Sequence, residues 1–443
     1  MKDLLLSQKN YKIAFVVFIF TNTLALGYFN ITINPLSYLF LFWGIAIICY
    51  NFIKKEIDFH DHKFVLILIY GFLLLFATII NQYSNQKSFI LALMQLIIFT
   101  LIYNNPRNFT INDIKNELKI IVPLVNILTA LASGISILMY LCDFSSSRYG
   151  WPIGMVNDRL FGIYFNCNPA AFLAAITILL ALIAIKNKSK YSHLYMINII
   201  IEVIYIILTK CRSAMIIIAI IITALCYVYF IKNKNFSKIK RYGLSIIICI
   251  GIFLGTIVTT NITSSIVNKQ QENSRFQIEE VFTSIDLLLK GDVQPALKLI
   301  DQVSSGRIEL LKTSYQVWQT SPIIGIGAGN FQTIGTHETS GTVVKQIQVV
   351  HSHNIFVETL VTTGIIGATI FLIFLFKTIK SLLKLFSNKS FNTYLMILLF
   401  TLIVVSESIG SLFDYGVFYT YSLSATLFWL FLGYLNQIEK DDG

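Results

Sequence analysis

Apolar residues run through most of the chain in long stretches that short polar segments separate. Each stretch approaches the length needed to cross a bilayer as a helix, about 20 predominantly apolar residues. We expect about twelve spanning helices, near residues 12–31, 36–53, 64–80, 88–103, 118–141, 168–186, 193–209, 213–231, 243–262, 355–377, 391–410 and 414–435. The pattern predicts an all-α, polytopic integral membrane protein in which residues 1–443 form a single transmembrane domain.

One long stretch has the composition of a water-exposed segment. It covers residues 263–354 and lies between the predicted ninth and tenth spans. Residues 304–320 within it predict a helix, which Ser304 or Ser305 is suited to cap. The apolar residues of this helix recur on one face, at Ile308, Leu311, Tyr315 and Trp318. We expect that face to pack on the membrane domain, so that this partly helical loop covers one opening of the bundle.

Composition supports the membrane assignment. Hydrophobic residues make up 55% of the chain and charged residues 13%, and the mean hydropathy is +0.70. A soluble chain carries about 25% charged residues, so this chain could not cover a water-facing surface. The net charge of +11 resides mainly in Lys-rich segments between apolar runs rather than in a basic helix with stacking aromatics. Nucleic-acid binding is therefore not expected.

The distribution of basic residues predicts the orientation. With the N-terminus inside, the cytoplasmic segments hold 22 of the 34 lysines and arginines, the long loop holds 7 and the short external loops hold 5. Cytoplasmic loops are enriched in lysine and arginine. We therefore expect a multi-pass protein of the cytoplasmic membrane with both termini in the cytoplasm and the long loop outside.

The arginines are distributed differently from the lysines. Twenty lysines are predicted inside and seven outside, whereas five of the seven arginines are predicted outside, at Arg148, Arg159, Arg212, Arg275 and Arg307. A guanidinium group binds phosphate at two points and keeps its charge when partly buried. The pattern indicates an anion site on the outer face, and a chance distribution of seven residues is the alternative.

Two polar groups lie close to or within predicted spans. Arg212 occupies a turn of a few residues between two spans, and Glu202 lies inside the preceding span. Charged groups at such depth are costly and are functional candidates by default. A structural salt bridge is the alternative for Glu202. Arg159, just before the sixth span, is either a site residue or a solvated loop charge.

Histidines mark the start of the predicted tenth span. The sequence His351-Ser352-His353-Asn354 precedes it, and Glu358 follows. An imidazole at the membrane edge is suited to exchange a proton with a substrate hydroxyl near neutral pH. A polar cap on the helix is the alternative. No cysteine or third histidine stands at metal-binding spacing, so we expect neither a metal nor another cofactor.

The remaining motifs have structural interpretations. The repeated glycines at Gly325, Gly327 and Gly329 follow a predicted helix without a Walker lysine, so they predict a tight turn rather than a nucleotide loop. Gly364 and Gly367 predict close helix packing.

The six cysteines form no metal-binding motif and most lie in apolar runs, so we expect them to act as small apolar residues. Cys142 and Cys167, which bracket one loop, are a less favoured disulfide pair.

Four segments carry recognisable patterns. Residues 305–331 contain SGR, W, P, GIG and F in that order, and residues 353–367 contain HNIFVE followed by two glycines. Residues 208–214 read LTKCRSA, and residues 159–170 carry a weaker pattern of R, G, N, N and A. In this order and spacing, the segments resemble the O-antigen ligase and Wzy-type polysaccharide polymerase superfamily. Cys211 stands where that superfamily usually has serine, which weakens the third match.

The resemblance implies an inverting, metal-independent glycosyltransferase that acts on the outer face of the membrane. Its donor would be an oligosaccharide on a polyprenyl diphosphate. By resemblance, His353 matches the essential histidine, Arg212 and Arg307 match the arginines that engage the diphosphate, and Arg159 is a further candidate. Accessory roles are open for His351, Asn354 and Glu358.

Several functions share this donor. A polymerase that joins lipid-linked repeats into a surface polysaccharide, such as O-antigen or capsule, leads. An O-antigen ligase and a protein O-oligosaccharyltransferase remain alternatives. A flippase for lipid-linked saccharides, another transporter and a non-catalytic scaffold are alternatives of other classes. The expected partners are the lipid-linked donor and acceptor, the bilayer, a flippase and chain-length regulators.

Overall fold

The computed structural model describes most of the chain. The described residues are 5–25, 35–147, 152–156, 158–232, 243, 251, 283, 286–303, 306–337, 351–386, 391–413, 418 and 422–442. The helices are α2 (Gln8–Thr23), α3 (Pro35–Ile53), α4 (His62–Ile80), α5 (Gln86–Ile97), η1 (Ile98–Tyr103), α6 (Ile111–Leu141), α7 (Cys167–Lys186), α8 (Ser192–Thr209), α9 (Arg212–Lys232), α12 (Val293–Val303), α13 (Arg307–Thr320), α14 (Phe331–His337), α16 (Ile355–Leu385), α17 (Phe391–Phe413) and α18 (Leu423–Asp442). The strands are β1 (Ser145–Ser146), β2 (Ile153–Val156) and β3 (Arg159–Gly162).

The prediction of a polytopic helical membrane protein is confirmed. Within the described residues, eight helices are long and apolar enough to cross a bilayer, namely α3, α4, α5 with η1, α6, α7, α8, α16 and α17. Three further predicted spans are occupied by α2, α9 and α18, which are not among those eight. The predicted ninth span, residues 243–262, lies outside the described residues apart from 243 and 251. The total of about twelve stays a prediction.

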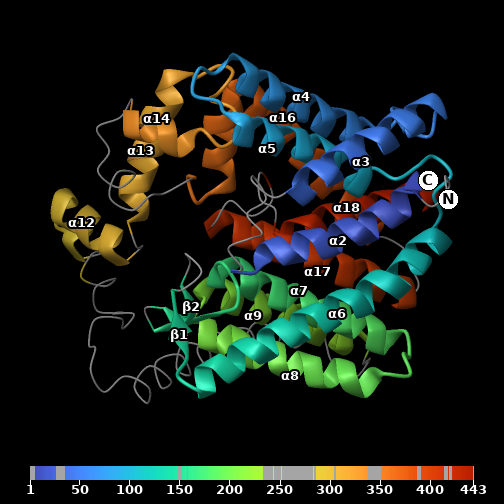
Figure 1. Cartoon of the computed structure of the whole chain (residues 1–443). Coiled ribbons are helices and arrows are strands. Elements are labelled where there is room, and N and C mark those ends of the chain that lie inside the picture. Colours follow the sequence, from blue (N-terminus) through green and yellow to red (C-terminus); the bar gives the residue numbers. More distant parts are fainter. Residues whose placement is uncertain are drawn as a thin grey trace.

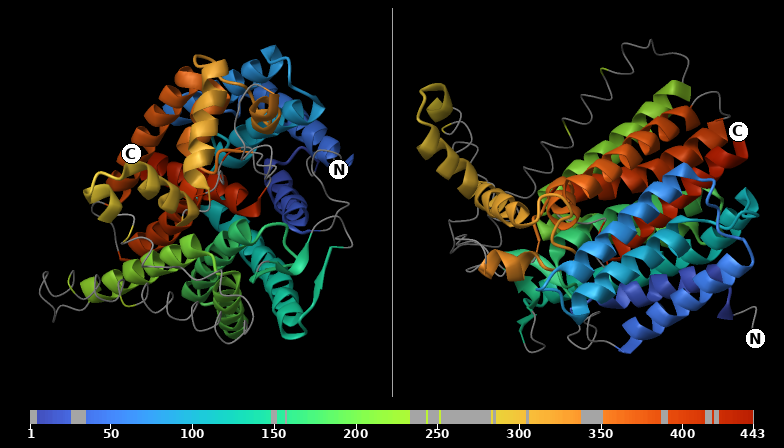
Figure 2. Two further views of the ribbon diagram at one scale, coloured as in Figure 1. Left: turned by 90° about the vertical axis from the view of Figure 1, so that its left-hand side faces the viewer. Right: turned by 90° about the horizontal axis from the view of Figure 1, so that it is seen from above.

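The long helices lie side by side and run between two ends of the molecule (Figures 1 and 2). One end carries the start of α2 and the end of α18, the described helices nearest the two termini, and is called the termini end below. The opposite end carries α12, α13, α14 and the small sheet, and is called the loop end (Figure 1). The left view of Figure 2 looks onto the loop end, where α13 lies across the bundle.

The centre of the bundle is α18, which is buried from Leu423 to Ile438. Trp429 packs edge-on against Phe99 and Tyr103, with ring centroids 4.9 and 5.8 Å apart. Because α18 contacts helices rather than lipid, it can carry hydroxyl and amide side chains that would be costly on a lipid-facing helix.

The segment between α6 and α7, which lies between two predicted spans, adds a small sheet to the mostly helical fold. β1, β2 and β3 form an antiparallel sheet in that order, with a bulge between Gly154 and Met155. Leu24 forms an isolated bridge with Tyr164, and the Ala25 N–H donates to the Ile163 carbonyl at 2.7 Å. These bonds follow the end of α2 at Thr23, so the helix ends before the predicted end of the first span, and residues 26–31 of that prediction lie outside the described residues.

The helix α16 is broken at Gly364, whose φ of 63° and ψ of −167° are not helical. The break frees two carbonyls and two N–H groups of the helix. A neighbouring segment, residues 322–327, satisfies them: Ile326 N–H donates to Val361 O, Gly327 N–H to Thr362 O, Ile365 N–H to Pro322 O and Ile366 N–H to Ile323 O, at 2.9–3.3 Å.

These bonds change the interpretation of the glycine-rich motif. Gly325, Gly327 and Gly329 all have positive φ, as a tight turn predicts. In addition, a Cβ on Gly325 would lie 2.3 Å from the Thr362 carbonyl carbon. The turn therefore packs directly against the broken backbone of α16 and supplies its hydrogen-bond partners. Gly364 forms the break itself, which corrects its predicted role in helix packing, whereas Gly367 packs near Leu73 of α4.

The predicted helix in the long loop exists, as α13, but its details differ. Its N-cap is Gly306, with φ of 80° and no side-chain cap bond, rather than a serine. Leu310 and Val317 are buried in a small apolar cluster, whereas Leu311 and Tyr315 are 55% and 56% exposed. The packing prediction is therefore wrong for Leu311 and Tyr315, because the helix buries the neighbouring stripe, whereas Trp318 of the predicted face does pack against this cluster.

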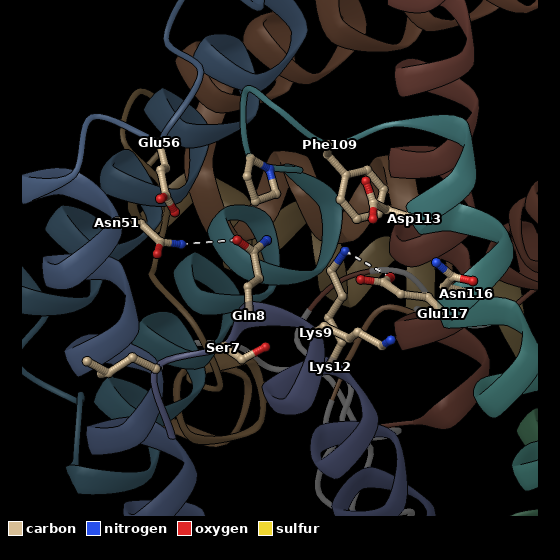
Figure 3. A pocket seen from close by; sticks show the side chains of 12 residues that line it. Ser7, Gln8, Lys9, Lys12, Asn51, Glu56, Phe109, Asp113, Asn116 and Glu117 are labelled. Carbon is tan, nitrogen blue, oxygen red and sulfur yellow. Dashed lines mark hydrogen bonds and ion pairs between the residues drawn. The ribbon is translucent and has the colours of Figure 1, made fainter. Parts of the chain in front are cut away.

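A buried ion pair lies at the termini end. Lys12 Nζ is 3.2 Å from Glu117 Oε2, and both side chains are at most 2% exposed. Lys12 also donates to Asn105 Oδ1 at 2.8 Å, and the Tyr434 hydroxyl donates to Glu117 at 2.5 Å. The sequence pattern placed Lys12 at the flank of the first span, but the structure buries it between α2, α6 and α18. A cavity of about 280 Å³ adjoins the pair (Figure 3).

We expect Gly364→Ala to destabilise the protein. A side chain in this backbone conformation costs about 1–3 kcal/mol, and the new Cβ would lie 2.2 Å from Ile323 O. Thermal unfolding in detergent measures the loss. Gly134→Ala in α6, where a Cβ meets nothing within 4 Å, is the matched control and should leave stability unchanged or raise it by about 0.5–1 kcal/mol. Equal melting of the two variants would contradict the role of the break.

We also expect Lys12→Met to lower stability by about 3–5 kcal/mol, because it leaves Glu117 as an unpaired buried charge. The double variant Lys12→Met with Glu117→Met should recover most of that loss, because it removes both charges. Thermal unfolding of both variants checks this. A double variant as unstable as the sum of its two single variants would show that the pair is not coupled.

Candidate active site

The loop end brings together the predicted site residues from four separate segments. Arg159 is the first residue of β3 and follows Asp158, which has φ of 60°. Its Nε donates to the Thr209 carbonyl at 2.9 Å, and its Nη2 donates to Asn168 Oδ1. Thr209 ends α8 and Asn168 lies in the first turn of α7. Arg159 is therefore tied to two helices rather than being a freely solvated loop charge.

The second arginine begins α9. Lys210, with φ of 51°, reverses the chain after α8, and Cys211 is buried directly before Arg212. The Cys211 N–H donates to Thr209 Oγ1 at 3.3 Å, which holds this short turn. The positive charges of Arg159 and Arg307 both act on the guanidinium of Arg212. The turn thus gathers three arginines that are far apart in the sequence.

The third arginine is held at the end of α17. Arg307 Nη2 donates to the carbonyl of Phe413 at 2.7 Å, and its guanidinium carbon lies 5.4 Å from the centroid of the Phe413 ring. Carbonyls in the last turn of a helix have no partner within the helix, so the hydrogen bond uses an acceptor that α17 leaves open. The cation also gains a favourable contact with the aromatic face.

Residues 351–354, called the histidine segment below, are fixed to the same helix end. Asn354 caps α16 by accepting bonds from the Phe356 and Val357 N–H groups, as the capping alternative anticipated. Its Nδ2 donates to the Leu412 carbonyl at 3.1 Å. Leu412 precedes Phe413, so adjacent carbonyls of α17 hold the histidine segment and Arg307.

Both histidines lie next to each other. Their ring centroids are 4.1 Å apart, and the His353 N–H donates to His351 Nδ1 at 3.3 Å. Because Nδ1 is an acceptor here, neutral His351 carries its proton on Nε2. His353 has φ of 52°, an uncommon conformation for a residue other than glycine. Such conformations persist where surrounding contacts impose them, often at functional sites.

Glu358 contacts the residue that precedes His353. Its Oε2 accepts bonds from both the N–H and the hydroxyl of Ser352, each at 2.8 Å. Glu358 is 3% exposed and lies in the first turn of α16, where a negative charge favours the helix dipole. The Glu358 carboxylate therefore holds the histidine segment against the first turn of α16 through Ser352. The sequence alone leaves the role of Glu358 open.

Lys210 is a fourth cation at the site, which the sequence interpretation did not select. Burial lowers the pKa of its amine, the Asp158 carboxylate raises it, and the Arg159 charge lowers it. The available signal was its place in the LTKCRSA segment, two residues before Arg212.

Several other predicted residues do not join this cluster. Glu202 is fully buried and accepts a hydrogen bond from the Ser133 hydroxyl at 2.8 Å; within the described residues it forms no salt bridge. Arg148 and Arg275 lie outside the described residues. Neither Cys142 nor Cys167 is in a disulfide, so the less favoured disulfide pair does not form.

The fold and the site define a class: a multi-pass helical membrane protein with a cluster of cations beside a histidine segment at one end. Residues 197–372 match the model of a family described as O-antigen ligase. The match includes Arg212, Arg307 and His353 and spans less than half of the chain. It confirms the resemblance to the O-antigen ligase and Wzy-type polymerase superfamily, and it supports a function of the ligase or polymerase type. No curated protein matches the chain.

Proposed function

We propose that the protein is a glycosyltransferase that polymerises oligosaccharide repeats carried on polyprenyl diphosphate. The main support is the arrangement of cations: the charges of Arg159 and Arg307 both act on Arg212, and Arg307 shares the end of α17 with the His353 segment. A cation cluster of this kind suits a diphosphate, because a guanidinium group binds two phosphate oxygens at once.

The reaction requires charge stabilisation and proton removal. The acceptor hydroxyl oxygen attacks the anomeric carbon of the donor sugar, and the bond from that carbon to the diphosphate oxygen breaks with its electron pair on the diphosphate. Arg159, Arg212 and Arg307 stabilise the charge that develops on this leaving group. Attack from the face opposite the leaving group inverts the anomeric configuration.

His353 is the proposed general base. Its imidazole accepts the proton of the attacking hydroxyl, a role for which a group titrating near neutral pH is suited. His351, Asn354 and Glu358 are accessory in this scheme. They hold the histidine segment in place. His351 accepts a bond from the His353 N–H, Asn354 donates to Leu412 O, and Glu358 accepts a bond from Ser352. The reaction in this scheme uses no metal ion and no organic cofactor.

The charge distribution supports the location of this reaction. The positive-inside pattern orients both termini toward the cytoplasm, and the candidate site lies at the opposite end of the bundle (Figure 1). The reaction would therefore occur on the outer face of the cytoplasmic membrane, with the polyprenyl chain in the bilayer. A flippase would supply the donor, and chain-length regulators would act on the product.

An O-antigen ligase is the second candidate, because the matching family carries that description. Ligase and polymerase use the same donor chemistry and differ in the acceptor. The two are separated by supplying either a lipid-linked repeat or a lipid A core as the acceptor.

We expect His353→Ala to reduce transfer by about 10²–10⁴-fold, the usual contribution of general acid–base catalysis. The assay uses the purified protein in lipid nanodiscs with polyprenyl-diphosphate-linked oligosaccharide, and product length is read on a gel. His337→Ala is the matched control, because His337 stacks on Tyr83 instead. Long products formed at the normal rate by His353→Ala would exclude the proposed base.

We expect Arg212→Lys and Arg307→Lys each to impair transfer, because lysine keeps the charge but loses two-point binding. Arg107→Lys provides the control, because Arg107 does not belong to the cation cluster: its Nε lies 4.0 Å from Asp58 Oδ1. Initial rates at saturating and limiting donor measure the effect. Full activity of both site variants would favour a non-catalytic scaffold.

A further inference from the structure

A column of polar side chains is buried between α6 and α8, and the proposed chemistry uses none of their functional groups. Its members are Asn126, Thr129, Ser133 and Ser136 on α6, and Asn198, Glu202, Tyr205 and Thr209 on α8. They recur every three or four residues, so each set lies on one helical face. Polar groups inside spanning helices are rare and usually have a specific partner or function.

The part of the column nearest the loop end is bonded to the strand β3 and the residues after it. The Tyr205 hydroxyl donates to the Phe161 carbonyl at 3.3 Å, and the Ile163 N–H donates to Ser136 Oγ at 3.1 Å. Gly162 lies so close that a Cβ there would be 2.0 Å from Ser136 Oγ. The backbone of residues 161–163 is therefore seated directly on both helices.

Glu202 lies one step deeper in the same network. Its carboxylate accepts a bond from Ser133 at 2.8 Å, and Ser133 Oγ lies 3.2 Å from the hydroxyl of Tyr164. Tyr164 and Tyr205 pack together with ring centroids 5.3 Å apart. Through Ser133, Glu202 is thus linked to Tyr164, the last residue of segment 159–164, which is called the attached segment below.

Arg159 begins the attached segment. Its Nε donates to the carbonyl of Thr209, which is itself the last residue of the column on α8. Residues 159, 161, 163 and 164 each bond to the column or to the helix end that carries it. The guanidinium group itself is bonded to α8 and, through Asn168, to α7, while α6 and α8 hold the residues that follow it, so its direction is set by helices rather than by a surface loop.

We propose that Glu202 and Tyr205 are positioning residues that hold Arg159 in the orientation in which it binds the donor diphosphate. This inference rests on the proposed function, because it assigns a purpose to the orientation of Arg159. The deeper part of the column serves as an internal comparison: Asn198 Nδ2 donates to Asn126 Oδ1 at 2.8 Å and joins the same two helices without touching residues 159–164.

The experiment uses the full-length protein in nanodiscs and compares Tyr205→Phe, Glu202→Leu and Glu202→Gln. Asn198→Leu is the matched control. One measurement is hydrogen exchange of the amides in residues 159–164, which does not depend on activity. The second is the donor KM and kcat in the transfer assay, with Arg159→Ala measured in parallel.

We expect Tyr205→Phe and Glu202→Leu to raise exchange in residues 159–164 and to raise the donor KM, each by about tenfold, the effect of losing one buried hydrogen bond. kcat should change less, because the reacting groups remain. Glu202→Gln keeps an acceptor for Ser133 and should behave nearly as the unaltered protein. Asn198→Leu should lower thermal stability without changing exchange in residues 159–164 or the donor KM.

Two results would overturn the proposal. One is unchanged exchange of residues 159–164 in both Tyr205→Phe and Glu202→Leu. The other is increased exchange with an unchanged donor KM, while Arg159→Ala does raise the KM. A donor KM that is unaffected by Arg159→Ala would instead refute the diphosphate role of Arg159 in the proposed function, which distinguishes the two failures.

Discussion

A backbone that leaves helical geometry inside a bilayer must find its hydrogen-bond partners within the protein, because lipid offers none. α16 meets this constraint at Gly364, where residues 322–327 satisfy the groups that the break exposes. That segment directly follows α13, so the helix that begins with Arg307 is fixed to α16. The same helix, α16, begins directly after the histidine segment. The break therefore helps to set the position of the third arginine relative to the histidines.

The candidate site is also shaped by how its cations are held. Arg159 donates to the Thr209 carbonyl and the Asn168 amide oxygen, and Arg307 donates to the Phe413 carbonyl. These acceptors are neutral oxygen atoms, and they orient the two guanidinium groups. Bringing like charges together is unfavourable in the free protein, and a bound diphosphate would relieve that repulsion. The opposite arrangement occurs at the termini end, where Lys12 is paired with Glu117 and the ion pair joins helices.

Features that depend on local sequence were predictable. Long apolar runs indicate spanning helices whatever surrounds them, and Asn354 was recognisable as a possible cap because it immediately precedes an apolar run. Features that depend on packing were not. The face of α13 that becomes buried contains Leu310 and Val317, whereas an apolar stripe of similar strength at Leu311 and Tyr315 stays exposed. Periodicity identifies an apolar stripe but does not say which neighbour will cover it.

The sequence by itself determined the membrane class, most of the helical segments and the residues that match the O-antigen ligase superfamily, because hydropathy and motif order are properties of consecutive residues. Only the tertiary structure decided that Gly364 breaks a helix, that Lys12 is buried in an ion pair and that Lys210 joins the arginines. It also decided that Glu202 accepts a hydrogen bond from the Ser133 hydroxyl, next to the segment that Arg159 begins, rather than pairing with a cation. These outcomes depend on which helices become neighbours, and hydrogen bonds between distant segments leave no periodic signal along the chain.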